Sequence, residues 1–171
     1  NKHLFDESIA IAWASKGLEQ GSGKLIHQVV AEELPQCKKT AVMSGPTFAG
    51  EVARNLPTSI TVASHSESFS RQISDDLHSG NFRVYISTDL IGVELGGSLK
   101  NVLAIAAGAA DGFGFGAKTR AALITRRLAD MQLLGAAIGG KRENFMGLAR
   151  AGEYILPCTR YAARHLQPGV C

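Results

Sequence analysis

The sequence has little cysteine, and its three cysteines form no metal-binding pattern. Cys37, Cys158 and Cys171 are odd in number and share neither a CxxC spacing nor a Cys/His spacing. The pattern therefore predicts no metal site, and it favours a reduced, cytoplasmic setting over a disulfide-rich secreted one. Nothing in the sequence indicates a Ser-His-Asp or Cys-His nucleophilic centre either.

Neither sign of charge is in large excess. Eighteen Lys and Arg residues against fifteen Asp and Glu give a net charge of +3. The adjacent basic pairs are Lys38-Lys39, Arg126-Arg127 and Lys141-Arg142, which lie far apart in the sequence. A nucleic-acid surface needs a basic stripe or cluster, so no nucleic-acid partner is predicted, whereas small anionic ligands remain compatible with this charge.

Only one long apolar segment is present, Leu90–Ala110, and its two charges are Glu94 and Lys100. These charges, its glycines and the amphipathic segments on both sides argue against a membrane span. We therefore predict a helix that is buried on all sides within a soluble protein. Asn1 leads into mixed polar sequence, so no signal peptide is expected, and the missing initiator Met suggests an internal piece of a longer protein.

Short apolar runs alternate with helical segments up to about residue 88, and no internal repeat is visible. The predicted strands are 9–14, 40–43, 58–63 and 82–86, and the predicted helices are 22–34, 48–55 and 66–77. Ser22 or Gly23 is expected to cap the first helix, and Ser44 or Thr47 the second. The alternation predicts an α/β fold with largely parallel pairing, in which the first strand is buried on both faces.

After residue 88 the strands stop, and the predicted helices are 90–110, 117–138 and 142–149. The glycine-rich Gly112–Gly116 lies between two of these helices. A dinucleotide-binding fingerprint needs a strand before its glycines, so this segment is predicted to be a helix–helix connection with positive φ angles. No other GxGxxG occurs, so the chain lacks the usual pyrophosphate-binding turn.

Lys100 is the first candidate for chemistry. Helical spacing places it in a stripe of mainly small residues: Val93, Gly96, Gly97, Ala104 and Ala107. A lysine there would project into space left empty by its neighbours, where a desolvated amine can act as an acid or base. A lysine that reaches the surface is the alternative.

Two strand ends supply the other candidates, because ligands gather beyond the carboxyl ends of parallel strands. Lys16 follows the first strand and could meet a phosphate or a carbonyl oxygen. Ser44–Thr47 follows the second strand and leads into a helix start, where free amides favour anions. The alternatives are a solvated turn lysine and an ordinary capped turn.

Several motifs together resemble one family over about residues 9–148. They are WASKGLE, SGPTFAGEVA, LPTSITVAS, FRVY, IGVELGGSLKNVLAIAAGAADGFGFGAKTRAALITR and LAD-M--LG. These resemble NAD(P)-dependent glycerol-3-phosphate dehydrogenase of the bacterial type. The resemblance implies the C-terminal part of a Rossmann-type parallel-sheet domain in residues 1–88 and the N-terminal part of an all-α substrate domain in residues 89–171.

The same resemblance implies an activity and an assignment of residues. The reaction would be reversible hydride transfer between dihydroxyacetone phosphate and sn-glycerol 3-phosphate, with NAD or NADP as cofactor. The enzyme would be cytoplasmic and act in phospholipid biosynthesis, and a homodimer is an open alternative. Lys100 resembles the proton acceptor for the C2 hydroxyl, and Lys16 a contact to both substrate and cofactor. Gly45 and Thr47 resemble substrate contacts, and Ala49 a cofactor contact.

The resemblance weakens after Leu148. Glu153 stands where the family has a substrate-binding aspartate, and Arg164 matches an arginine expected to contact substrate and cofactor. The neighbours of that arginine are changed to Ala163 and His165. Two rival functions therefore stay open: a non-catalytic interaction or regulatory protein derived from this fold, and a related two-domain dehydrogenase acting on another hydroxy compound, such as a hydroxy acid.

The missing glycine turn generates a first prediction. The 171-residue chain by itself is expected to show no NADH- or NADPH-dependent reduction of dihydroxyacetone phosphate, because nothing in it replaces the pyrophosphate-binding turn. Following the absorbance of the reduced nicotinamide measures this. Turnover by the isolated chain would show that the motif is not needed.

Overall fold

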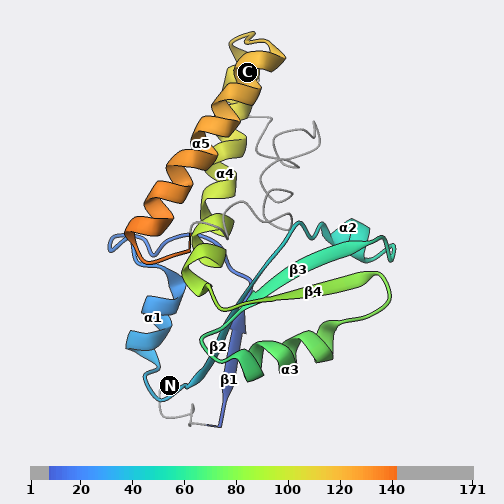
Figure 1. Ribbon diagram of the computed structural model, residues 1–171, viewed down its shortest axis with the longest axis vertical. Helices are drawn as coiled ribbons and strands as arrows, with labels where there is room; N and C mark the ends of the chain where they lie inside the picture. The colour runs from blue at the N-terminus through green and yellow to red at the C-terminus, as the bar shows by residue number, and fades with distance from the viewer. Residues whose placement is uncertain (1–7, 142–171) are drawn as a thin grey trace. The chain divides into compact units, whose positions relative to one another are not determined.

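The computed structural model describes residues 8–141, which contain four strands and five helices (Figure 1). In chain order these are β1 Ala10–Trp13, α1 Ile26–Glu33, β2 Lys39–Ser44, α2 Ala49–Val52, β3 Thr58–Ala63, α3 Glu67–Leu77, β4 Phe82–Ser87, α4 Leu90–Gly112 and α5 Ala117–Ala137. The chain forms two compact units, Asn1–Leu95 and Gly96–Cys171. All nine segments were predicted from the sequence with the right type.

The first unit is built on one sheet with the strand order β1-β2-β3-β4. β1 pairs parallel to β2, and β3 pairs parallel to β4, which confirms the α/β class. The pairing is largely parallel, as predicted, and the exception is β2 with β3, which are antiparallel. A parallel pair needs a crossover that carries the chain back along the sheet, and the connection here contains only the four-residue helix α2.

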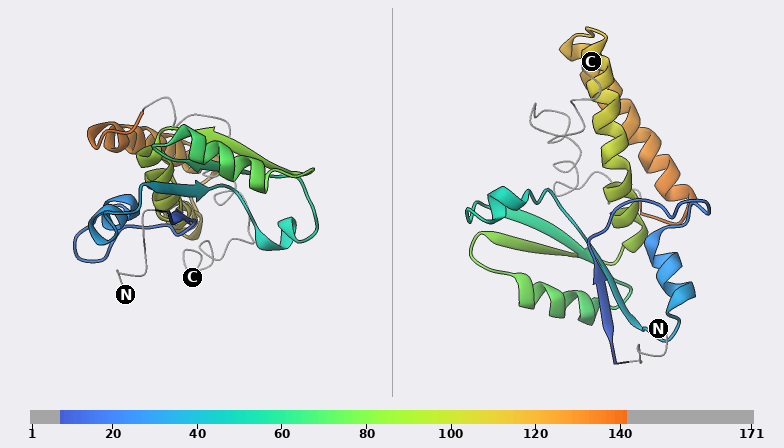
Figure 2. Two further views of the ribbon diagram at one scale, coloured as in Figure 1. Left: turned by 90° about the horizontal axis from the view of Figure 1, so that it is seen from below. Right: turned by 180° about the vertical axis from the view of Figure 1, so that it is seen from behind.

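Helices lie on both faces of this sheet, with α1 beside β1 and β2 and α3 beside β3 and β4 (Figure 2). One face packs against α1 and the start of α4 through a cluster of Trp13, Val42, Ala63, Leu90 and Val93, with Ile11, Ile26 and Val30 around it. The other face packs against α3 through Ala41, Val62 and Phe69, with Met43, Ile73 and Val84 around them. Neighbouring residues of β2 and β3 thus point to opposite faces, as the two-residue strand period requires.

The burial of β1 differs from the prediction. Trp13 is buried, but Ala10 and Ala12 are exposed in the described structure, so the strand is not covered on both faces. β1 is an edge strand of the described sheet, and the helices named above cover only the face that carries Trp13.

The helix starts correct the two expected caps and show one that was not predicted. Ser66 caps α3, where its hydroxyl accepts the Phe69 amide. Leu25 rather than Ser22 or Gly23 stands at the start of α1, and Phe48 rather than Ser44 or Thr47 at the start of α2; neither makes a side-chain cap. Both helices therefore begin after the residues that were expected to cap them.

At the start of α4, the Asp89 carboxylate accepts the Gly92 amide at 2.9 Å. Asp89 is itself buried, and its own amide donates to the Ser87 hydroxyl at 3.1 Å. A carboxylate at this position satisfies a free amide and favours the helix dipole. The helix therefore begins where the sequence placed the transition from strands to helices.

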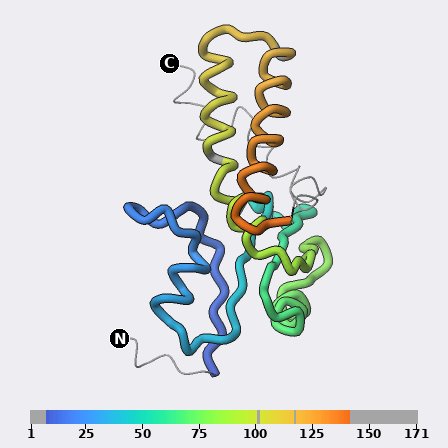
Figure 3. The backbone as a smooth tube through the Cα atoms, turned by 60° about the vertical axis from the view of Figure 1, so that its left-hand side comes forward, coloured from blue at the N-terminus to red at the C-terminus, as the bar shows by residue number. Residues whose placement is uncertain are grey.

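The second unit contains the rest of α4 and α5, which run side by side (Figure 3). The prediction that the long apolar helix is buried on all sides is wrong, because Val102 is 60% exposed and Ile105 is 50% exposed in the described structure. By length and composition alone α4 could cross a membrane: its most apolar window has a mean hydropathy of 1.4, and 59% of that window is buried. Core helices of soluble proteins meet the same test.

The glycine-rich segment connects two helices, as predicted, and Gly114 has a φ of +73°. Next to it the Arg120 guanidinium contacts the Asp111 carboxylate at 2.6 Å and so links the start of α5 to the end of α4. Phe113 and Phe115 stack at a tilt with their ring centroids 6.0 Å apart. The predicted helix over 142–149 lies outside the described residues.

At Gly45 the backbone packs so closely against β3 that there is no room for a Cβ atom. A Cβ at this position would lie 2.5 Å from the Ser59 carbonyl oxygen and 2.8 Å from the Ile60 Cα atom. We predict that Gly45→Ala lowers the free energy of unfolding by about 1–3 kcal/mol, because rigid backbone must shift to accept the methyl group. Urea denaturation measures the loss.

Gly50→Ala is the matched control, since a Cβ there has no neighbour within 4 Å. It should leave stability unchanged or slightly raised, because alanine is the better helix former. Equal denaturation midpoints for the two variants would show that the close approach at Gly45 does not matter.

Candidate functional site

The structure of the first unit brings two of the predicted site segments to one edge of the sheet. β1 and β2 are parallel, with Trp13 opposite Val42, so both strands end at that edge. Lys16 follows the end of β1, and Gly45 follows the end of β2 at Ser44. Ligands of open parallel sheets gather at such an edge.

The turn after β2 is fixed by backbone contacts. Gly45 is buried against β3, and its carbonyl accepts the Thr47 amide at 2.8 Å. Thr47 and Ala49 are exposed, so both can be reached by a ligand. The expected anion site at a helix start is not supported, because four residues make α2 too short to concentrate a helix dipole.

Lys100 lies in the second unit and is partly exposed. Its stretch of α4 is held by a core of Leu103, Ala107 and Met131, with Leu99, Ile124 and Leu128 around it. The small residues of the predicted stripe are buried: Gly96, Gly97, Ala104 and Ala107. Ala107 packs against α5, so part of the space that the stripe was expected to leave open is filled. An apolar groove of the second unit, to which Lys100 does not contribute, is lined by Leu99, Val102, Leu103, Arg127, Asp130, Met131 and Leu134.

Glu94 is a buried carboxylate, 5% exposed, for which the sequence predicted no partner. Its Oε1 accepts the Trp13 indole N–H at 3.0 Å and the His27 backbone N–H at 3.0 Å. Its Oε2 contacts the His27 ring at Nδ1. The sequence signal for these partners was the position of Glu94, a charged residue inside an apolar helix. Such a charge is buried only when several donors satisfy it.

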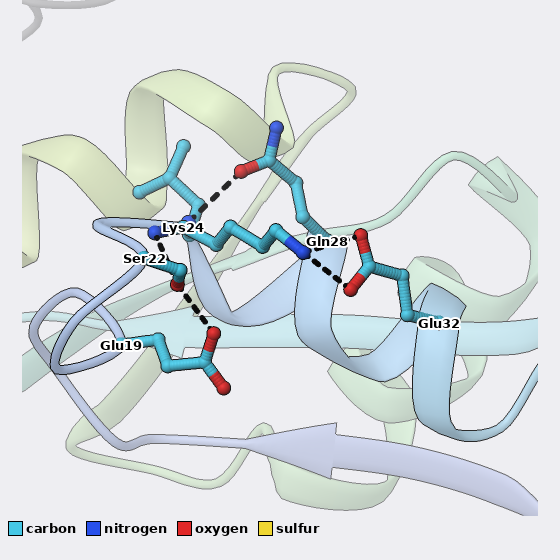
Figure 4. A network of polar contacts seen from close by, with 6 residues as sticks. Glu19, Ser22, Lys24, Gln28 and Glu32 are labelled. Atoms are coloured by element: carbon cyan, nitrogen blue, oxygen red, sulfur yellow. Dashed lines mark hydrogen bonds and ion pairs between the residues drawn. The ribbon is translucent and has the colours of Figure 1, made fainter.

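The loop between β1 and α1 carries its own polar network (Figure 4). The Lys24 ammonium contacts both oxygens of Glu32, at 2.8 and 2.6 Å, and the Glu32 carboxylate raises the pKa of Lys24. The Ser22 hydroxyl accepts the Lys24 amide and contacts Glu19. The Lys24–Glu32 pair is solvent-exposed, so it contributes little to stability.

Two of the predicted site residues, Glu153 and Arg164, lie outside the described residues. Within residues 8–141 no group of His, Cys, Asp and Glu side chains could hold a metal ion. β1 and α1 are joined by the long segment 14–25, and the single glycine of the β2–α2 turn, Gly45, is packed against β3. Neither connection within residues 8–141 has the GxGxxG spacing of a pyrophosphate-binding turn.

Comparison with known proteins decides the family. The family model described as NAD-dependent glycerol-3-phosphate dehydrogenase N-terminus matches residues 1–70, and the one described as its C-terminus matches residues 89–170. The chain belongs to this family. A curated relative from Thioalkalivibrio sulfidiphilus, named glycerol-3-phosphate dehydrogenase [NAD(P)+], is 51% identical over 165 residues, or 96% of this chain and 50% of the relative.

Solved structures of the family share the fold. The glycerol-3-phosphate dehydrogenase of Coxiella burnetii matches with a TM-score of 0.91 and 49% identity, over 99% of this chain and 51% of that one. The enzyme of Saccharomyces cerevisiae matches with a TM-score of 0.85 at 23% identity, over 99% of this chain and 52% of that one, which supports the fold alone. The chain thus spans about half the length of the relatives it matches, and it combines a Rossmann-type α/β part with a helical part.

The packing that holds the Lys100 region of α4 generates a prediction. Met131 is buried against Leu103, so Met131→Ala should lower the free energy of unfolding by about 2–5 kcal/mol through lost burial and a cavity. Leu133→Ala, two residues away on a side chain that is 59% exposed, should change it by less than about 0.5 kcal/mol. Thermal unfolding followed by circular dichroism compares them, and similar losses would contradict this packing.

Proposed function

We propose that this chain supplies the reactive amine and part of the substrate site of an NAD(P)-dependent glycerol-3-phosphate dehydrogenase. The reaction is reversible hydride transfer between dihydroxyacetone phosphate and sn-glycerol 3-phosphate. The observation that carries the proposal is that Lys16 and Gly45, both in motifs of this family, follow strand ends at one edge of the sheet in a chain 51% identical to a named enzyme.

Lys100 is assigned the proton transfer. For oxidation of the alcohol, the Lys100 amine would take the proton of the C2 hydroxyl. In the reverse direction the Lys100 ammonium hydrogen-bonds to the ketone oxygen and returns that proton as the alkoxide charge develops. NAD or NADP supplies or accepts the hydride when bound.

The other assignments concern binding. Lys16 is assigned to the substrate and the cofactor, since an ammonium can meet a phosphate or a carbonyl oxygen. Gly45 and Thr47 are assigned to the substrate and Ala49 to the cofactor, and the exposure of Thr47 and Ala49 supports access by a ligand. Glu153 and Arg164 complete the proposed set as substrate contacts, and Arg164 also as a cofactor contact.

Four broader features belong to the same proposal. Residues 1–88 form the end of the dinucleotide-binding domain and residues 89–171 the start of the substrate domain, which is supported by the separate matches of the two family models. α4 is a core helix rather than a membrane span, which is supported by the buried and hydrogen-bonded Glu94. The protein acts in the cytoplasm, and a homodimer is compatible with it.

A chimera tests the proposal, because the chain spans 51% of the Coxiella burnetii enzyme at 49% identity. Replacing the matching segment of that enzyme by this chain should retain NAD(P)H-dependent reduction of dihydroxyacetone phosphate. Lys100→Ala in the chimera should lower kcat by roughly a hundredfold or more, the range that general acid–base catalysis supplies. Steady-state kinetics over a range of substrate concentrations measures this.

Lys38→Ala is the matched control, because Lys38 is an exposed lysine whose ammonium donates to the Pro35 carbonyl. It should leave kcat and KM unchanged. A folded chimera without activity, or one in which the two alanine variants reduce the ketone equally well, would contradict the assignment.

A further inference from the structure

The segment that carries Lys16 is attached at both ends to one carboxylate. Lys16 lies in the loop 14–25, which begins after Trp13 at the end of β1 and leads into α1. Trp13 donates its indole N–H to Glu94 Oε1, and His27, in the first turn of α1, donates its backbone N–H to the same oxygen, both at 3.0 Å. Glu94 therefore bonds to the residues on either side of this loop.

The bond to His27 does the work of a helix cap. Leu25 is the N-cap residue of α1, and its apolar side chain cannot accept a hydrogen bond. Within α1 the Gln28 side chain accepts the Leu25 amide at 3.0 Å, but the His27 amide turns to Glu94, 67 residues away in sequence. A carboxylate at a helix start is favoured by both the free amide and the dipole. Glu94 thus fixes where α1 begins.

Between its two attached ends the loop is closed on itself. The Glu19 amide donates to the Lys24 carbonyl at 2.8 Å, and the Gly23 amide donates to the Glu19 carbonyl at 2.9 Å. Leu18 and Leu25 form an isolated bridge. A loop with these internal bonds has little freedom of its own, so its placement depends on its ends.

We infer that Glu94 is a positioning residue for Lys16: it does not touch the substrate, but it holds the loop so that the Lys16 ammonium meets the phosphorylated ligand at the sheet edge. This inference rests on the proposed function, because it needs Lys16 to bind the substrate. It assigns a role to a buried acid that the proposed chemistry does not use.

The test measures binding of sn-glycerol 3-phosphate to the 171-residue chain by calorimetry. Glu94→Leu fills the same space but accepts no hydrogen bond, and it should raise Kd roughly tenfold or more, the loss expected when a charge-assisted bond to the ligand is misplaced. Glu94→Gln keeps a carbonyl oxygen for the Trp13 and His27 N–H groups, so it should bind within about threefold of the parent chain.

A double mutant separates positioning from a merely structural role. In a Lys16→Ala background, Glu94→Leu should cause little further loss, because the contact that it misplaces is already gone. Additive losses, or Glu94→Leu binding as tightly as the parent, would overturn the inference while leaving the proposed function standing. A parent chain that does not bind the ligand would overturn the inference, and the activity of the chimera tests the proposed function separately.

Folding is checked in the same samples. Trp13 is the single tryptophan of the sequence, so its fluorescence reports directly on the Glu94 contact. If Glu94→Leu does not fold, Trp13→Phe replaces it, because phenylalanine keeps most of the apolar packing and removes one donor. Trp13→Phe should then raise Kd in the parent chain but not in the Lys16→Ala background, and the opposite pattern would overturn the inference.

Discussion

The first unit depends on the hydrogen bonds that the buried Glu94 carboxylate accepts. A carboxylate inside a protein is stable only when several donors surround it, and here the donors come from the end of β1 and the start of α1. Removing the acid would leave the buried Trp13 indole N–H and the half-buried His27 amide without that acceptor. One side chain on α4 therefore sets where a strand ends and where a helix starts.

The proposed site depends on this arrangement because Lys16 and Thr47 lie on connections rather than inside strands or helices. Lys16 is exposed and follows a strand, and Thr47 is exposed and follows a glycine turn packed on β3. Such positions owe their geometry to the rigid elements beside them, as is common for binding residues on loops. The sheet, the packed Gly45 and the buried Glu94 supply that rigidity in the first unit.

Local signals in the sequence predicted much of the fold. The run 58–63 predicted β3 with its observed bounds, and the spacing of Phe69, Ile73 and Leu77 predicted α3, because both depend on residues close in sequence. The antiparallel pairing of β2 and β3 was missed because it depends on the path of the connection rather than on either strand. The cap of α1 was missed because its acceptor is Glu94, 67 residues from His27.

The site was predictable to a different degree. Strand-end reasoning brought Lys16 and Gly45 to one edge, and the parallel register of β1 and β2 confirms that edge. The roles of these residues and of Lys100 came from the family resemblance, and they stay predictions. Composition also suggested a helix covered on all sides, whereas Val102 and Ile105 are exposed, because an apolar sequence does not by itself determine which neighbours pack against it.

The most direct measurement is a crystal structure of the chain, or of the active chimera, with sn-glycerol 3-phosphate bound. If Lys100 is the base, its Nζ should lie within hydrogen-bond reach of the C2 hydroxyl oxygen, at about 2.6–3.2 Å. The phosphorylated ligand should also contact Lys16 and the turn at Gly45–Thr47. A ligand whose C2 hydroxyl meets another group, with the Lys100 ammonium directed into solvent, would contradict the assignment of the proton acceptor.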